Sequence, residues 1–221
     1  MQPIFNFLKT LKQNNNKEWF DANKQAYLDS KAELEAFVDE LIRGISKFDK
    51  GISTDTKAKD CVFRIYKDVR FSKDKTPYKT NMGASINPGG KKSLKAGYYF
   101  HCEPGNSFIA GGMYMPEPEY LQAIRQEIDY NPDPLMKIFK SASFKKYYNG
   151  LSDEEKLKNP PKGFDKEHPN IELLKNKHFI VLHQFHDKQV MDKNFAKEAI
   201  AGFKAMHPFL EYLRDATADV K

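Results

Sequence analysis

Apolar residues recur at helical spacing in the N-terminal third of the chain. One stripe consists of Leu34, Val38, Leu41, Ile45 and Phe48. Steps of three and four residues place these side chains on one face of a helix. Asn15, followed three residues later by Glu18, has the pattern of a capping pair and predicts where the helical region begins.

The same spacing returns near the C-terminus. A second stripe consists of Ala199, Phe203, Met206, Leu210 and Leu213. It predicts a long C-terminal helix with one apolar face. Pro208 lies inside this stripe, so we expect it to kink the helix or to split it in two.

The middle of the chain has the pattern of antiparallel strands. Ala96–Glu103 and Ser107–Met115 are rich in Tyr, Phe, Ile and Met, and the intervening residues 103–106 read Glu-Pro-Gly-Asn, a turn sequence. Gly83–Asn87 and His178–His186 are further strand candidates, and Pro118–Tyr130 is predicted to be helical. Strands in a run with helices at both ends predict an α+β fold, an antiparallel sheet with helices packed on one side. We find no linker and expect one domain over residues 1–221.

Composition adds the expected environment. The chain has 221 residues, 40% of them hydrophobic, with 17 Phe and 11 Tyr, enough for a substantial core. No apolar run is long enough to span a bilayer, and the first residues lack the pattern of a leader. The two cysteines, Cys61 and Cys102, lie in apolar stretches and are expected to be buried thiols. The sequence therefore predicts a cytoplasmic protein that is not membrane-bound.

The positive charge is concentrated in one segment. The net charge is +6, but residues 57–95 alone contain eleven Lys and Arg against three Asp, a local charge of +8. The rest of the chain therefore sums to −2. This distribution indicates a localised surface that attracts anions.

Residues 62–71 alternate strictly enough to predict a strand. One parity carries Phe63, Ile65, Val69 and Phe71, and the other carries Arg64, Tyr66, Asp68 and Arg70. Alternation with a period of two places the two sets on opposite faces of a strand. We expect this strand to belong to the sheet, with the four apolar side chains buried.

The polar face of this predicted strand is the candidate site. Residues two apart on a strand lie roughly 7 Å apart, so Arg64, Asp68 and Arg70 could form one cluster in which the aspartate orients a guanidinium toward an anion. The loop that follows adds Lys75, Tyr78 and Lys79. The expected anion-binding residues are Arg64, Arg70, Lys75 and Lys79, and the expected proton-transferring catalytic residues are Asp68 and Tyr78.

Four functions fit this cluster. It could bind a small ligand that carries phosphate or carboxylate, or it could be the active site of an enzyme acting on such a ligand. It could instead bind nucleic acid, with Tyr66, Tyr78 and Tyr98 available for stacking. The fourth possibility is a structural network of ion pairs. Binding of a small anionic ligand is the favoured hypothesis, and nucleic acid is a less favoured partner.

No metal or cofactor is expected. On one strand, His183 would face away from His178 and His186, and those two would lie roughly 25 Å apart. This run alone cannot provide three zinc ligands. The chain also lacks a Walker A loop and a dinucleotide-binding fingerprint.

The basic segment also resembles a known signature. The residues that carry the resemblance are Arg64, Lys67, Asp68, Arg70, Phe71, Asp74, Lys75 and Tyr78. They are similar to the signature of domain of unknown function family 2461, a set of conserved bacterial proteins of about this length. The chain departs from it at Lys67, where the family usually has Arg, which keeps the charge but not the bidentate geometry. The resemblance extends over nearly the whole chain and implies no particular reaction, substrate or cofactor.

Overall fold

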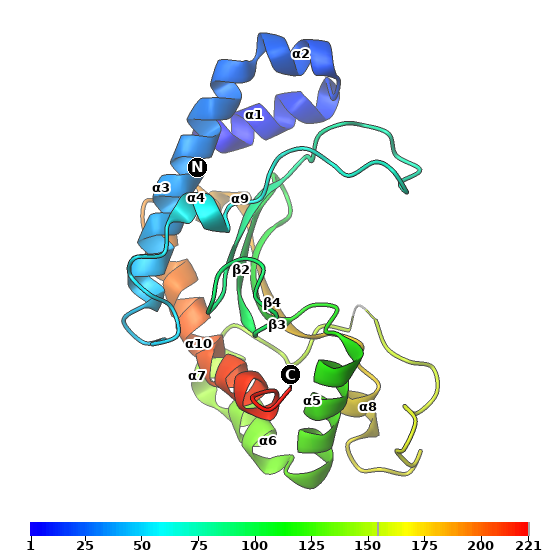
Figure 1. Ribbon diagram of the computed structural model, residues 1–221. Coiled ribbons are helices and arrows are strands. Elements are labelled where there is room, and N and C mark those ends of the chain that lie inside the picture. Colours follow the sequence, from blue (N-terminus) through cyan, green and yellow to red (C-terminus); the bar gives the residue numbers. More distant parts are fainter. Residues whose placement is uncertain (154, 221) are drawn as a thin grey trace.

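The computed structural model describes residues 1–153 and 155–220, and a four-stranded antiparallel sheet lies at its centre (Figure 1). The strands are adjacent in the order in which they occur along the chain: β1 (Met82–Ile86), β2 (Gly97–Cys102), β3 (Ser107–Met113) and β4 (Phe179–Phe185). The strands predicted from apolar alternation in the middle of the chain and at 178–186 are confirmed, and so is the α+β class.

The helices precede the sheet, follow it and make up part of the long connection between β3 and β4. Before the sheet come α1 (Gln2–Gln13), α2 (Lys17–Ala22), α3 (Lys24–Ile45) and α4 (Ala58–Cys61). Between β3 and β4 come α5 (Pro118–Tyr130), α6 (Asp133–Lys140), α7 (Ala142–Lys145) and α8 (Ile171–Leu174). After β4 come α9 (Asp187–Val190) and α10 (Phe195–Ala216).

One face of the sheet is covered by the two longest helices. α3 contacts β1, α10 contacts β3, and the two helices contact each other (Figure 1). From β2 the side chains on this face are Tyr98, Phe100 and Cys102, none of which is accessible to solvent. The side-chain sulfur of Met206 on α10 lies only 2.2 Å from where a Cβ at Gly111 would be, so this glycine permits the close approach of helix and sheet. The apolar stripes of both helices therefore form the core.

The opposite face of the sheet carries the alternate residues. Ser85, Tyr99, Ala110 and Leu182 are in register across the four strands and form one row on it. Gly83, His101, Phe108 and Gln184 form the next row. In Figure 1 this face lies on the right of the sheet, between the loop of residues 62–81 above and α5 below. We call it the open face.

The predicted strand over 62–71 is wrong. Residues 62–81 instead form an irregular excursion, here called the arm, that extends away from the sheet (Figure 1). Val62 bridges Ala84 of β1, but further out the arm pairs with its own returning half, with Tyr66 opposite Tyr78.

The predicted burial of this segment is wrong as well, except at one residue. Ile65 is 2% exposed, but Phe63 is 38% exposed, Phe71 is 95% exposed and Val69 is only half-buried. The alternation specifies two faces of the chain, yet no second layer of structure covers the apolar one beyond Ile65. Burial needs that partner layer, so the outer part of the arm stays in water.

Two boundaries also differ from expectation. The cap of α2 is Asn16, whose side chain accepts a hydrogen bond from the Trp19 N–H at 2.9 Å, and not Asn15. α10 runs through Pro208 as one helix and is not split. The buried residues Met206 and Phe209 flank the proline, and their packing holds both halves against the core.

No helix in the described parts of the chain combines the length and apolar character that crossing a membrane requires.

Candidate functional site

The structure disperses the six residues expected to form one cluster. Asp68 and Arg70 lie on the outer part of the arm, where they pair with each other: Arg70 Nε and Nη2 donate to the two carboxylate oxygens at 2.9 and 2.6 Å. The hydrogen bonds from Arg70 lower the pKa of Asp68 below its ordinary value. The Arg70 side chain is 76% exposed. The expected orientation of a guanidinium by this aspartate is therefore present, but on an open surface.

Lys75 makes its hydrogen bond within the arm. Its ammonium donates to the carbonyl oxygen of Val69 at 3.0 Å and so ties the two halves of the arm together. Lys67 does the same by donating to Asp74 and Thr76 at 2.6 and 2.7 Å. These contacts, foremost the one with Lys67, lower the pKa of Asp74 far below its usual range. A lysine suits this position because its contacts are two single oxygens and not a planar anion.

Tyr78 is part of the core and not of an exposed cluster. Its side chain is 3% exposed and stacks on Phe20 of α2, with ring centroids 4.0 Å apart. Burial raises the pKa of Tyr78. Because Tyr78 pairs with Tyr66, Asp68 lies two residues further out along the arm. The two residues expected to transfer protons are therefore not brought together.

Lys79 is the member of the set that lines a pocket. Its ammonium lies 5.5 Å from the centre of the Phe63 ring, and Lys91 approaches the same ring at 5.5 Å. Burial, and then repulsion from Arg64 and Lys91, lower the pKa of Lys79. Among the described residues no carboxylate lies within ion-pair distance of Lys79. Three cations thus gather here, at the base of the arm.

The pocket that Lys79 enters lies on the open face and has a volume of about 620 Å³. Its floor is the row of strand residues already described, including Tyr99, Ala110 and Leu182. Aromatic and apolar side chains form much of its wall: Phe63, Leu94, Phe108, Tyr114, Met115 and Tyr120. These come from the arm, the β1–β2 loop, β3, the segment between β3 and α5, and the start of α5, so several segments together line one space. We call this the open-face pocket.

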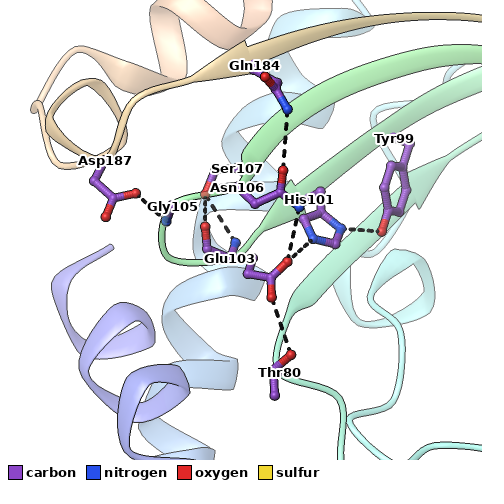
Figure 2. Close-up of polar contacts among 9 residues, drawn as sticks. All are labelled: Thr80, Tyr99, His101, Glu103, Gly105, Asn106, Ser107, Gln184 and Asp187. Carbon is purple, nitrogen blue, oxygen red and sulfur yellow. Dashed lines mark hydrogen bonds and ion pairs between the residues drawn. The ribbon is translucent and has the colours of Figure 1, made fainter. Parts of the chain in front are cut away.

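Tyr99 and His101 of β2, which line this pocket, and Glu103, the residue after the strand, form a row of hydrogen-bonded side chains (Figure 2). The Tyr99 hydroxyl lies 3.0 Å from His101 Nδ1, and His101 Nε2 lies 3.3 Å from a carboxylate oxygen of Glu103. The His101 ring stacks on Phe108, with centroids 4.5 Å apart and planes inclined by 8°. The three residues alternate along one strand and its end, so their side chains share the open face.

Burial dominates the electrostatics of this row of side chains. It lowers the pKa of His101, and the Glu103 carboxylate opposes only part of that shift. Burial, with a smaller contribution from Glu103, raises the pKa of Tyr99 to about 12. At neutral pH the histidine is therefore neutral and the tyrosine keeps its proton.

The Glu103 carboxylate is fixed by hydrogen bonds from the arm and from the tight turn that follows β2. Thr80 and Asn106 donate hydrogen bonds to its carboxylate at 3.3 and 3.2 Å. Gly105, with φ of +79°, occupies the turn position that requires a positive φ, directly after Pro104. The Gly105 N–H donates to Asp187 at 2.7 Å, which anchors the turn beyond β4 (Figure 2). The predicted Glu-Pro-Gly-Asn turn thus positions an acceptor for His101.

A protein-family comparison adds the classification. The model of the family described as "Conserved hypothetical protein (DUF2461)" matches residues 3–212. This chain belongs to that family. Searches of curated proteins and of solved structures gave no match. The family resemblance seen in the arm is therefore confirmed, while the function of the site has to be argued from its geometry.

Sequence reasoning missed Tyr99, His101 and Glu103 as a group. The signal was present, because the three polar residues alternate within the strand predicted at 96–103. The pattern was obscured because the intervening residues, Tyr98 among them, are aromatic or apolar too.

The histidines near β4 take part in backbone contacts. His178 Nδ1 accepts from the Met115 N–H at 3.0 Å, and His183 Nδ1 lies 2.9 Å from the Tyr147 carbonyl oxygen. Across residues 1–153 and 155–220, no three His, Cys, Asp or Glu side chains gather as a metal site would require.

Proposed function

We propose that this protein binds a small molecule with an apolar, partly aromatic body and one anionic group in the open-face pocket. The observation that carries the proposal is Lys79, a partly buried cation that faces an otherwise largely apolar pocket. A phosphate or carboxylate on the ligand would supply the counter-charge.

The size and lining of the pocket support a ligand of this kind. Sites for small molecules usually enclose about 300–1,000 Å³, with mostly apolar walls and a few fixed polar groups. The open-face pocket, at about 620 Å³, lies within that range. Phe63 and Phe108 contribute aromatic surface to the lining, and Ala110 leaves space in the floor.

The charge around Lys79 favours an anion. Repulsion from Arg64 and Lys91 contributes to the lowered pKa of Lys79, and an anion bound there would relieve it. Arg64 and Lys79 thus remain proposed anion contacts, whereas Lys75 already has a partner in the arm and Arg70 is paired with Asp68.

Nucleic acid is a weaker candidate than a small ligand. Of the three tyrosines considered for base stacking, Tyr78 and Tyr98 are buried in the core, and only Tyr66, 44% exposed, is accessible. Base stacking needs exposed ring faces along a basic groove.

Three probes test the proposal through thermal unfolding. Phenyl phosphate combines the two expected features, and inorganic phosphate and phenol each carry one of them. A ligand that binds the folded state raises the melting temperature according to its concentration and affinity. We expect phenyl phosphate to raise it more than either fragment does at the same concentration.

Lys79→Gln should weaken binding of phenyl phosphate about tenfold or more, because a charge-assisted contact is lost. Lys92→Gln is the matched control, because Lys92 is exposed and belongs to the same basic segment but does not line the pocket. Equal binding by wild type and Lys79→Gln would contradict the proposed site.

A further inference from the structure

Two neighbouring tyrosines of β2 make hydrogen-bond networks of opposite kinds. On the helix side, the Tyr98 hydroxyl donates to Asp49 at 2.9 Å and lies 3.0 Å from His207 of α10. Arg214 of α10 completes that network with a contact of 2.9 Å to Asp49. This network links β2, α10 and the segment that follows α3, and it therefore stabilises the fold.

The hydrogen-bond network of Tyr99 links fewer parts of the fold. Tyr99, His101 and Glu103 are successive alternate residues of one segment, so the bonds between them do not connect separate elements. Thr80 is the contact that reaches another segment, through Glu103. A purely architectural role would not require a hydroxyl and an imidazole that line a pocket and are backed by a carboxylate.

The order of the three side chains, hydroxyl, imidazole and carboxylate, determines the direction of each hydrogen bond. The Glu103 carboxylate accepts, so His101 Nε2 carries the ring proton and Nδ1 is left as an acceptor. The Tyr99 hydroxyl therefore donates to Nδ1, and its oxygen can accept a further hydrogen from the pocket side. A reactive group backed by a base, which is itself oriented by a third group, is the arrangement found in acid–base and nucleophilic catalysis.

We propose that Tyr99, backed by His101 and Glu103, abstracts a proton from the bound ligand, so that the protein is an enzyme acting on a weakly acidic C–H or O–H bond of an anionic, partly aromatic molecule. This inference rests on the proposed function, because it needs a ligand in the open-face pocket.

The proton balance of the step is complete without a further reactant. The substrate C–H or O–H bond breaks, and its proton bonds to the Tyr99 oxygen. The former hydroxyl proton of Tyr99 moves to His101 Nδ1, giving an imidazolium beside the Glu103 carboxylate. The electron pair stays on the substrate, where Lys79 can stabilise the new negative charge. Reversal of the same steps returns a proton to the substrate.

Phenylpyruvate is a suitable probe because it carries an aromatic ring, a carboxylate and an acidic C–H bond beside a ketone. Proton abstraction gives its enolate, and return of a solvent deuteron is observed by proton NMR in D₂O. Thermal unfolding with the same compound measures binding separately. Tyr99→Phe removes the hydroxyl and keeps the ring, and Tyr130→Phe is the matched control, because Tyr130 is 83% exposed and does not line the pocket.

We expect wild type to accelerate the exchange above the rate in buffer. Tyr99→Phe should lower the enzymatic rate about 100-fold, or to the buffer rate, while phenylpyruvate still stabilises the variant. Tyr130→Phe should exchange at about the wild-type rate. If wild type binds the probe without accelerating exchange, or if Tyr99→Phe exchanges as fast as wild type, the proton-transfer inference is wrong and the binding proposal stands. If phenylpyruvate gives no Lys79-dependent stabilisation, the binding proposal fails and this inference fails with it.

The pH profile distinguishes proton transfer from a structural role of His101. The exchange rate should fall as the pH drops through the pKa of His101, because a protonated ring cannot accept the tyrosine proton. Glu103→Gln removes the carboxylate that raises this pKa, so the acidic limb should move to lower pH. The other charged residues lining the pocket, Lys79, Lys95 and Glu117, are unchanged in this comparison. An acidic limb at the same pH in Glu103→Gln would overturn the role of His101.

Discussion

Asn15 and Tyr78, 63 residues apart in sequence, are joined by two hydrogen bonds. The Asn15 side-chain amide donates to the Tyr78 carbonyl oxygen at 2.9 Å, and its oxygen accepts from the Tyr78 N–H at 3.1 Å. One side chain thus satisfies both backbone groups of a buried residue, much as a neighbouring strand would. This contact attaches the arm to the N-terminal helices and keeps Lys79, the next residue, at the pocket wall.

Asn15→Ala should therefore destabilise the protein by about 1–3 kcal/mol, because it leaves buried backbone groups without partners. Chemical denaturation gives the free energy of unfolding. Asn14→Ala is the control, since Asn14 makes its side-chain bond within its own helix end, to Thr10. Equal losses in the two variants would mean that the Asn15 contact does not anchor the arm.

The two tyrosines of β2 should respond differently to loss of their hydroxyls. Tyr98→Phe removes a donor from Asp49, which is 2% exposed, and should cost about 1–3 kcal/mol of stability. Tyr99→Phe should cost about 1 kcal/mol or less, because its bond runs along the same strand. Denaturation of both variants under one condition tests this, and a larger loss in Tyr99→Phe would reverse the assignment of structural and functional roles.

His101 should make stability depend on pH. Its pKa is lowered in the folded protein, chiefly by burial, so the unfolded chain binds the proton more readily. Its contribution is fully present above the unfolded pKa of about 6.5 and is lost as the pH falls toward the lower folded value. His101→Gln should flatten the dependence of the unfolding free energy over that window. Parallel curves for wild type and His101→Gln would contradict the burial of a neutral imidazole.

A substitution at Arg70 tests whether the anion site lies on the arm or in the open-face pocket. Asp68 already occupies two donors of the exposed Arg70 guanidinium, so Arg70→Ala should melt close to wild type and keep its stabilisation by phenyl phosphate. Lys79→Gln should lose that stabilisation. The same thermal scans include both variants, and loss of the phosphate effect in Arg70→Ala would move the anion site to the arm.

Local sequence patterns were sufficient to predict α3, α5, α10 and the four strands, but not the other helices. The stripe from Leu34 to Ile45 predicted α3, and the Glu-Pro-Gly-Asn turn predicted the β2–β3 hairpin, because spacing and turn chemistry act over a few residues. The same reasoning failed at Phe71. Its alternating position indicates a face, but burial depends on whether another element packs there, and no element in the described part of the chain does.

The sequence by itself determined the long helices α3 and α10, the four strands, the α+β class, the family and the concentration of positive charge between residues 57 and 95. Tertiary structure decided which of these residues meet. Tyr98 and Tyr99 are adjacent and chemically identical, yet packing of α3 and α10 on one side of the sheet buries the first in the core and leaves the second in a pocket with Lys79. Alternation states only that neighbours point to opposite faces, and the face that becomes a site is set by where distant helices and the arm come to lie.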